Sequence, residues 1–196
     1  MIIKKILVLL ITILILGGCD KPSVSEGEPS SAEAYINHRA DDYQRGQYDE
    51  AISDFNKAIE INPGYAEAYL NRGTAYHRIS QYEQAILDLN KAIEINSRYA
   101  EAYFNRGVVY GKGKQRYNQA ISDFTKAIVI NPAYAEAYTN RRNAYASKNQ
   151  YDKAILDYKK AIEINPKLAE TYNNLGITLG KKRASMSRLS YISARP

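Results

Sequence analysis

The chain has 196 residues, of which 27 are Lys or Arg and 21 are Asp or Glu, and its formal net charge is +6. The basic excess lies at the two ends: Lys4 and Lys5 stand near the start, and five basic residues with no acid follow Gly180. Residues 20–180 hold the remaining 20 basic residues and all 21 acidic ones. This balance excludes nucleic acid as a partner of the central part of the chain.

The first 18 residues have the order of a secretory signal peptide. Lys4 and Lys5 are followed by an apolar run over residues 6–16 and then by two glycines before Cys19. This run is short for a membrane span, which takes roughly 20 residues. The order of charge, apolar run and small residues predicts a segment that directs export.

Residues 16–19, LGGC, resemble the lipobox of bacterial lipoproteins, in which cleavage before the cysteine exposes it to attachment of diacylglycerol. Cys19 is the only cysteine, so a disulfide within the chain is excluded and lipidation is its simplest use. The prediction is a lipoprotein signal peptide over 1–18 and a chain anchored to the cell membrane through lipid on Cys19. An ordinary cleaved signal and an uncleaved anchor are the alternatives. Resemblance to lipoproteins of two-membrane bacteria implies, from Asp20, the periplasmic face of the inner membrane.

Residues 19–31 are predicted to be the lipidated cysteine and a flexible tether. After Cys19 the stretch DKPSVSEGEPSS is rich in Ser, Pro, Gly and Glu and has no apolar periodicity. A tether of this length and composition has a root-mean-square reach of roughly 20 Å. The domain that follows can therefore stand clear of a lipid surface.

Four nearly identical stretches follow, beginning with AISDFNKAIEINPGY at Ala51 and returning at Ala85, Ala120 and Ala154. Their starts are 34, 35 and 34 residues apart, and the text before each one repeats as well. A fixed period of this length predicts a repeat architecture. The predicted domain covers 32–180, with units 32–65, 66–99, 100–134 and 135–168 and a half unit, 169–180.

Each unit is predicted to form two helices. In the second unit, apolar or small residues recur at helical spacing from Ala68 to Tyr76 and again from Ala85 onward. The motif INP ends three of the four second helices, because proline disfavours helical geometry in the residue before it. Ser97 replaces this proline after the second unit, where we expect a looser turn. The connections are too short for any but antiparallel neighbours.

The period and the residues at fixed places resemble the tetratricopeptide repeat family. Counted from the first Ala of each unit, aromatic residues recur at positions 4 and 11, Gly at 8, Ala at 20 and 27, a large apolar residue at 24 and Pro at 32. The resemblance extends over the whole of 32–180. It implies an all-α fold, a right-handed α-solenoid of stacked antiparallel helix pairs with four full repeats and a half repeat.

Three places depart from this pattern. Position 8 is Arg39 in the first unit and Arg142 in the fourth, and the third unit has one extra residue in the turn GKGKQRY. In the first unit a shift by one residue would put Ala40 at the helix crossing, so two registers stay open there. At Arg142 the guanidinium is expected either to reach outward to solvent or to push the two helices apart.

Charged residues also recur by position: Asp54, Asp88, Asp123 and Asp157 at position 23, and Arg72, Arg106 and Arg141 at position 7. Recurrence in every unit favours a structural contact, because catalytic groups converge on one pocket. We expect a ladder of Arg–carboxylate pairs, with contacts across unit boundaries such as Asp54 toward Arg72. His38 and His77 have no metal-ligand spacing beside them. No enzyme activity, cofactor, metal or small-molecule substrate is predicted.

The resemblance implies a ligand groove on the concave side, built from first-helix positions 2, 5, 6 and 9. The predicted groove residues are Glu67, Leu70, Asn71, Thr74, Glu101, Phe104, Asn105 and Val108, with Asn140 as a further Asn at position 6. Asn amides suit the backbone of an extended or partly helical segment, since they both donate and accept hydrogen bonds. The alternative is that they cap or bridge neighbouring helices. Glu at position 2 disfavours an acidic ligand, so the predicted occupant is a neutral or basic segment with an apolar anchor near Phe104.

Two functions are compatible with these features. The resemblance implies a membrane-anchored scaffold that binds a segment of another envelope protein. The alternative is an accessory subunit that modulates a cell-envelope enzyme, such as a cell-wall hydrolase or synthase. The basic residues 181–196 are predicted to be a disordered tail, and electrostatic adhesion to anionic lipid is the other interpretation of them.

Overall fold

The computed structural model of the chain describes residues 31–33, 35, 47–113, 115–166 and 176–184. Within them the chain forms helices and no strand. The helices are α4 (Tyr48–Ile61), α5 (Ala66–Arg78), α6 (Tyr82–Ile95), α7 (Ala100–Val108), the π-helical turn η1 (Val109–Gly113), α8 (Tyr117–Ile130), α9 (Ala135–Ser147) and α10 (Tyr151–Ile164). Residues 176–184 are helical as well.

Several predicted features lie outside the described residues. They are the signal peptide, Cys19, nearly all of the tether, most of the first helix of the first unit, the start of the half unit and the last part of the basic tail. Arg39 and Ala40, the two residues that could occupy the helix crossing of the first unit, also lie outside the described residues. Of the helices that the structure describes, none combines the length and the apolar character that crossing a membrane requires.

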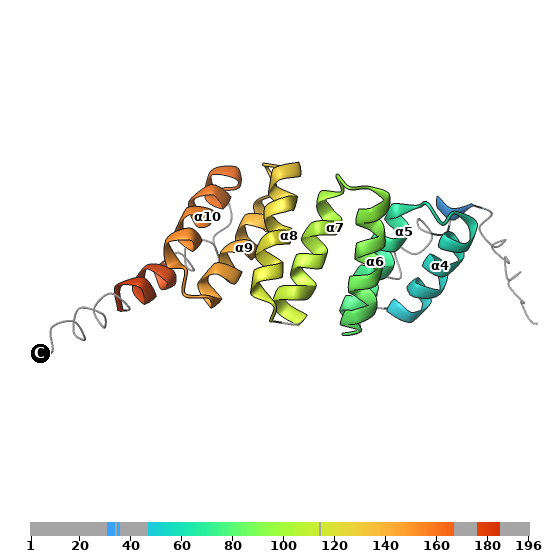
Figure 1. Cartoon of the computed structure of the whole chain (residues 1–196), viewed down its shortest axis with the longest axis horizontal. Coiled ribbons are helices and arrows are strands. Elements are labelled where there is room, and N and C mark those ends of the chain that lie inside the picture. Colours follow the sequence, from blue (N-terminus) through green and yellow to red (C-terminus); the bar gives the residue numbers. More distant parts are fainter. Residues whose placement is uncertain (1–30, 34, 36–46, 114, 167–175, 185–196) are drawn as a thin grey trace, which may run out of the picture.

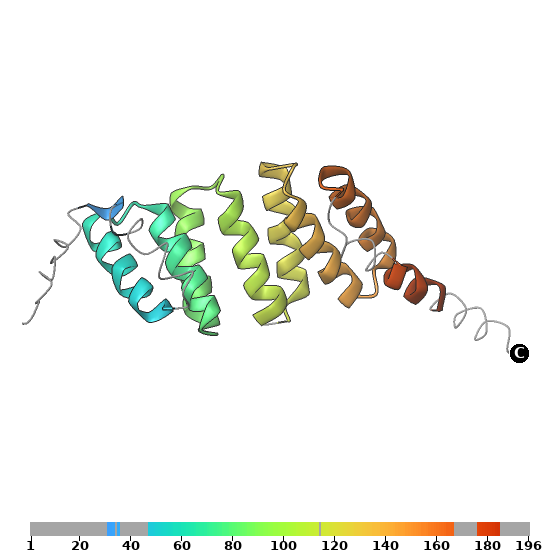
Figure 2. The same ribbon diagram turned by 180° about the vertical axis from the view of Figure 1, so that it is seen from behind.

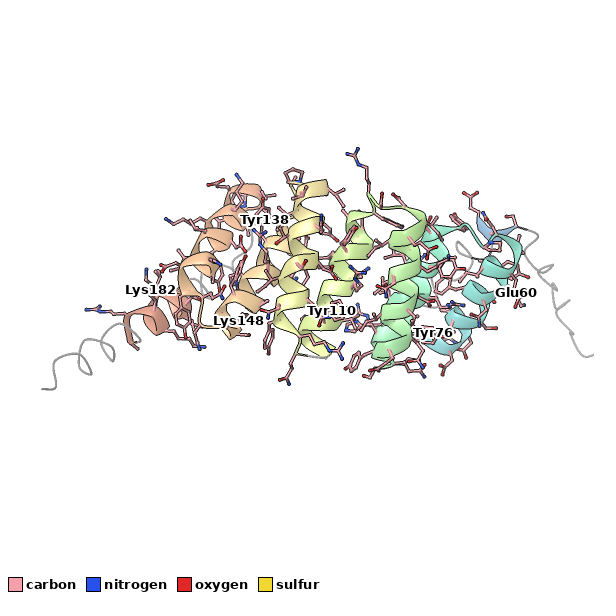
Figure 3. All side chains as sticks on the ribbon, viewed as in Figure 1. Glu60, Tyr76, Tyr110, Tyr138, Lys148 and Lys182 are labelled. Atoms are coloured by element: carbon pink, nitrogen blue, oxygen red, sulfur yellow. The ribbon has the colours of Figure 1, made fainter. Side chains whose placement is uncertain are left out.

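The helices follow one another along the long axis of the molecule in chain order (Figure 1), and the view from behind shows the same succession (Figure 2). Within the units α5 packs on α6, α7 on α8 and α9 on α10, and successive units contact each other through α4–α5, α6–α7 and α8–α9. Tyr76, Tyr110 and Lys148, at or just after the ends of three successive first helices, lie along one edge of this stack (Figure 3). The predicted stack of antiparallel helix pairs is confirmed.

Small residues at fixed positions let the two helices of a unit approach closely. The alanines at position 20 are fully buried: Ala51, Ala85, Ala120 and Ala154. A Cβ built on Gly107 would lie 2.7 Å from Cε1 of Phe124, and one on Gly73 would lie 3.0 Å from Cγ of Leu89. Position 8 therefore sits directly against the large apolar residue at position 24, and glycine there leaves that side chain its space.

The turn after each second helix depends on asparagine. Asn62, Asn96 and Asn131 have extended backbone and end their helices. Their side-chain oxygens accept hydrogen bonds from the backbone N–H two residues on: Gly64 to Asn62 at 3.0 Å, Arg98 to Asn96 at 3.0 Å and Ala133 to Asn131 at 3.1 Å. Ser97 stands where the pattern has proline, and yet the bond to Asn96 is unchanged. The asparagine closes the turn with or without the proline.

The extra residue of the third unit is absorbed by η1. In the second and fourth units a backbone N–H closes the turn between the two helices by donating to the carbonyl five residues earlier. These bonds run from Gln81 to Tyr76 and from Gln150 to Tyr145. In the third unit the equivalent bond, from Arg116 to Tyr110, spans six residues. The last turn of the first helix widens to π geometry to provide this residue. The second helix consequently begins in its regular place.

Candidate functional site

A ladder of ion pairs connects the two helices of the second, third and fourth units. The guanidinium of Arg72 donates two hydrogen bonds to the carboxylate of Asp88, both at 2.7 Å. Arg106 meets Asp123 at 2.8 and 2.7 Å, and Arg141 meets Asp157 at 2.9 and 2.6 Å. These aspartates are buried, and each is paired in the same way. The predicted ladder is confirmed, and the recurring aspartates serve structure.

The third donor of each arginine reaches back to the preceding unit. The Nη1 atoms donate to side-chain oxygens of the previous second helix: Arg72 to Asn56 at 2.6 Å, Arg106 to Asn90 at 2.6 Å and Arg141 to Thr125 at 3.0 Å. Across the first boundary Asp54 was the expected partner of Arg72, and the contact observed is with Asn56. Each arginine thus joins three helices, and this contact sets how one unit sits on the next.

The predicted groove residues come together on successive first helices, α5, α7 and α9. We call the surface formed by positions 2, 5, 6 and 9 of these three helices the first-helix face. On it Glu67 and Glu101 are exposed, and six further predicted residues are half-buried: Asn71, Thr74, Phe104, Asn105, Val108 and Asn140. Leu70 is only 8 % exposed and packs in the core. The apolar surface open to a ligand therefore falls on Phe104 and Val108.

Two of the three asparagines at position 6 of this face already bond within the protein. Asn105 donates from Nδ2 to Oγ1 of Thr74 at 3.3 Å, which bridges α7 and α5. Asn140 donates from Nδ2 to the carbonyl of Glu136 at 2.9 Å, one turn earlier in α9. In the described part of the structure Asn71 makes no side-chain hydrogen bond. Each amide keeps its oxygen and at least one N–H for a further partner.

Phe104 forms an aromatic floor on the first-helix face. Its ring lies 4.9 Å from that of Tyr134 and 5.8 Å from that of Phe124, measured between centroids. Both pairs are tilted, an arrangement favourable for aromatic rings. Phe124 is buried beneath, while Phe104 keeps part of its surface open.

A row of glutamates follows one edge of the first-helix face, at the start of each first helix. Glu67, Glu101 and Glu136 are exposed, and tyrosines lie between them. Burial, together with Glu67 and Glu101, raises the pKa of Tyr99 to about 12. Burial, together with Glu101 and Glu136, raises the pKa of Tyr134 to about 12. The negative potential along this edge favours a cationic partner and disfavours an anionic one.

Arg142 corrects one sequence-based expectation. Its side chain does not reach outward to solvent, because it is 6 % exposed and its Cζ lies 3.8 Å from the ring centroid of Tyr158. In the second and third units position 8 is glycine against Leu89 or Phe124. In the fourth unit arginine at position 8 is accompanied by tyrosine at position 24, and the flat guanidinium stacks on the flat ring.

A cavity of about 560 Å³ opens toward the C-terminal end of the stack. Its walls come from α7, η1, α8, α9, α10 and the helix over 176–184. Val108 and Asn140 of the predicted groove line it, together with residues that the sequence did not single out as a site: Lys112, Gln115, Asn143, Ile177 and Lys181. The sequence signal that could have indicated this cavity was the set of departures from the repeat pattern, since Lys112 and Arg142 both belong to them.

Metal and catalytic chemistry have no visible centre in the described residues. There, no three side chains among His, Cys, Asp and Glu are grouped so that they could hold a metal ion. His77 is half-buried beside Tyr82, with ring centroids 6.0 Å apart. Burial, together with Arg78 and Lys112, lowers the pKa of His77.

Comparison with known proteins agrees with this architecture. A family profile described as TPR repeat matches residues 41–80, 75–113 and 143–182, which is more than half of the chain, and one described as Tetratricopeptide repeat matches residues 100–134. The chain matches no curated protein at a significant level.

Solved structures give three informative matches. The crystal structure of a MamA protein is 28% identical with a TM-score of 0.70, over 83% of this chain and 88% of that one. MamA from Desulfovibrio magneticus RS-1, residues 41 to the end, is 22% identical with a TM-score of 0.71, over 85% and 94%, and shows the fold alone. The first TPR of Spaghetti (RPAP3), bound to the HSP90 peptide SRMEEVD, is 26% identical with a TM-score of 0.58, over 61% and 94%.

Proposed function

The chain belongs to the tetratricopeptide repeat family, and from that premise we propose that it is a scaffold whose first-helix face holds a segment of another protein. The observation that carries the proposal is Phe104, a half-buried aromatic ring set on Phe124 and Tyr134 with its outer surface open. An apolar anchor on a partner would bury this ring further. A similar repeat domain, that of Spaghetti, is bound to a peptide in its own structure.

The chemistry of the face favours a neutral or basic segment. Glu67, Glu101 and Glu136 stand exposed along one edge, so an acidic segment placed beside them would meet like charge. The peptide on Spaghetti, SRMEEVD, carries three acids, and this chain is not suited to receive such a sequence at that edge. The backbone of the segment would be held by Asn71 and by the remaining donors and acceptors of Asn105.

The location proposed for this scaffold is the cell envelope. The support is the sequence alone: the signal-like residues 1–18, the single Cys19 and the tether that follows it. In Cys19→Ser we expect the precursor to stay uncleaved and to incorporate no radioactive fatty acid. Normal cleavage and labelling of this variant would contradict the lipid anchor and leave the scaffold function standing.

Partner capture tests the binding face. The full-length protein is crosslinked in intact cells, and captured proteins are compared between the wild type and the variant Phe104→Ala, Asn105→Ala. The matched control is Leu87→Ala, Leu156→Ala, which removes two side chains that are 67% and 65% exposed on second helices. Melting temperatures establish that each variant is folded.

The expected result is loss of the captured segment in the first variant and wild-type capture in the control. Undiminished capture by Phe104→Ala, Asn105→Ala, with loss in Leu87→Ala, Leu156→Ala, would place the partner on the second helices and overturn the proposal.

A further inference from the structure

Cations gather at one edge of the stack, where the first helices end and the second helices begin; Lys148 and Lys182 are labelled there in Figure 3. Among the described residues from α5 onward, six exposed and two half-buried cations lie in these turns, at the starts of second helices or in the helix over 176–184: Arg78, Lys112, Arg116, Lys148, Lys153, Lys181, Lys182 and Arg183. We call them the basic edge. The same stretches hold two acids, Glu83 and Asp152.

Contacts between successive units make the basic edge one surface. Burial, together with Arg78 and Lys112, lowers the pKa of His77, so cations of the second and third units act on the same ring. Lys112 and Lys181 line the same cavity. Lys182 forms an ion pair with an acid at the start of α10. The basic edge therefore continues from the second unit to the last described helix.

The opposite edge of the stack carries the other sign of charge. There, the turns from each second helix to the next first helix hold the row of glutamates, Glu67, Glu101 and Glu136, and one exposed cation, Arg98. The two edges are separated by the length of a helix of 13 or 14 residues, which is about 20 Å. Charges that nearly cancel over the repeats are thus separated in space.

Helix stability explains only part of the basic edge. Cations near the C-terminal ends of first helices, such as Arg78 and Lys112, are favoured by the helix dipole. Arg116 and Lys153 stand at the starts of second helices, where the same dipole disfavours a cation. The first turn of α8 contains no acid that would offset Arg116. Stability of the helices therefore does not account for these two positions.

The helix over 176–184 adds apolar side chains to this charge. Ile177 is 50% exposed and Leu179 is 48% exposed. Lys181 and Arg183 each follow one of them by four residues, so an apolar side chain and a cation share one side of the helix. Apolar side chains beside cations suit the headgroup region of a bilayer. A soluble polyanion would leave the apolar ones without a partner.

We propose that the basic edge, together with the helix over 176–184, rests on the anionic surface of a lipid bilayer. Such a surface attracts Lys and Arg side chains within about one Debye length, roughly 8 Å at physiological salt. The row of glutamates lies beyond that range, so it stays turned to solvent and open to a basic segment. Five of the eight cations belong to the repeats, so the adhesion extends well beyond residues 181–196. The inference rests on the proposed location at a membrane.

Energy transfer from a label on the protein to the lipid surface tests the proposal. The full-length chain with Cys19→Ser is reconstituted into vesicles whose headgroups carry an acceptor dye, and a donor dye is attached through Asn118→Cys, at the start of α8. The matched label is on Ser97→Cys, an exposed turn residue of the opposite edge. Vesicles of phosphatidylcholine are compared with vesicles of equal parts phosphatidylcholine and phosphatidylglycerol.

Transfer from Asn118→Cys should rise roughly twofold or more in the anionic vesicles and lose that rise at high salt. Transfer from Ser97→Cys should not rise. Equal transfer from Asn118→Cys in neutral and anionic vesicles would overturn the proposal, and so would an equal rise from both labels. Neither comparison needs a change to the basic edge.

Charge variants then locate the contact. In Lys112→Gln, Arg116→Gln the rise from Asn118→Cys should be lost. The control Lys126→Gln, Lys159→Gln removes the same charge from exposed positions ten and eight residues beyond the starts of α8 and α10, and it should keep the rise. A full rise in Lys112→Gln, Arg116→Gln would overturn the proposal. Binding of polyuridylic acid without any approach to anionic vesicles would assign the edge to nucleic acid instead.

The vesicle result is separable from the proposals on which the function rests. Residues 1–18 remain on the reconstituted chain whether or not Cys19 receives lipid in cells. The variant Phe104→Ala, Asn105→Ala changes the first-helix face alone and should keep the rise in transfer. Failure of the lipid anchor or of the first-helix face would therefore leave the measurement at the basic edge unaffected.

Discussion

The guanidinium of Arg142 lies 3.8 Å above the ring of Tyr158, and both side chains are buried. Glycine occupies position 8 in the two preceding units, where it faces Leu89 or Phe124. The fourth unit therefore fills the same crossing with a different pair of residues, and the two members of the pair depend on each other.

Arg142→Gly should destabilise the protein. The repeat pattern alone predicts a neutral or stabilising change, because glycine is the usual residue there. The structure reverses that expectation: the variant loses a desolvated stack and gains a glycine in a helix interior, together a loss of about 2 kcal/mol in the free energy of unfolding. Chemical denaturation measures it.

Compensation by Tyr158→Phe provides the control. The double variant Arg142→Gly, Tyr158→Phe recreates the pair formed by Gly107 and Phe124 in the third unit, so it should recover part of the lost stability. An unchanged unfolding free energy in Arg142→Gly would show that the stack contributes nothing.

The ion-pair ladder should respond strongly to loss of one partner. Asp123→Asn leaves Arg106 largely buried without its carboxylate, and removal of one member of a buried pair costs roughly 3–5 kcal/mol. The double variant Arg106→Met, Asp123→Leu removes both charges, and its loss should be well below that of the single variant. Urea denaturation of the three proteins measures the coupling.

An exposed pair offers the comparison for this prediction. Lys91 and Glu94 lie 2.8 Å apart on the surface of α6, and Lys91→Ala should leave the unfolding midpoint unchanged, since exposed pairs contribute little. A single and a double variant of Arg106 and Asp123 that lose equal stability would contradict an energetic link between the two residues.

Much of the fold could be predicted because the same residues recur at the same positions in four copies of one unit. The alanines and glycines of the helix crossing, the paired helices and the Arg–Asp ladder all recur, and the structure confirms them. The turn after the second helix was predicted from asparagine and proline together, with a looser turn where Ser97 replaces the proline, and Asn96 makes the same hydrogen bond beside Ser97 as the other asparagines make beside proline.

Residues that depart from the repeat pattern were the ones that the pattern could not interpret. Arg142 departs from the glycine of the two units before it, and its contact depends on Tyr158, a residue 16 positions away in the next helix. Lys112 is placed by a π turn, whose geometry follows from closing a longer loop between two fixed helices. Both line the cavity, so the part of the candidate site that the sequence missed is where the repeats differ.

Gly107 should tolerate no side chain. A Cβ there would lie 2.7 Å from Cε1 and 2.9 Å from Cδ1 of Phe124, a ring that is itself buried. Gly107→Ala should therefore cost about 1–3 kcal/mol through overpacking. Gly111→Ala is the matched control, because its Cβ would meet Ala120 at an ordinary 3.5 Å, and it should be neutral or slightly stabilising. Equal thermal stability of the two variants would refute the close approach at Gly107.

Alkaline pH should weaken the fold through Tyr99 and Tyr134. Burial and the nearby glutamates raise the pKa of each phenol to about 12 from 10.0. In the unfolded chain these phenols lose their protons first, so between pH 10 and 12 the unfolded state binds fewer protons and the free energy of unfolding falls as pH rises. Below pH 10 their contribution is fully present.

Substitution by phenylalanine removes this dependence, because the side chain then has no proton to lose. The variant Tyr99→Phe, Tyr134→Phe should unfold at a higher pH than the wild type when helicity is followed by circular dichroism during an alkaline titration. Tyr151→Phe, at the start of α10 and away from the row of glutamates, is the control and should leave the alkaline midpoint in place. The phenolate absorbance of the wild type should show two tyrosines that ionise late and together with loss of helicity. If the variants Tyr99→Phe, Tyr134→Phe and Tyr151→Phe shift the midpoint alike, the two phenols beside the row of glutamates have no special part in the alkaline transition. The negative potential assigned to that edge would then be too weak to select a basic ligand.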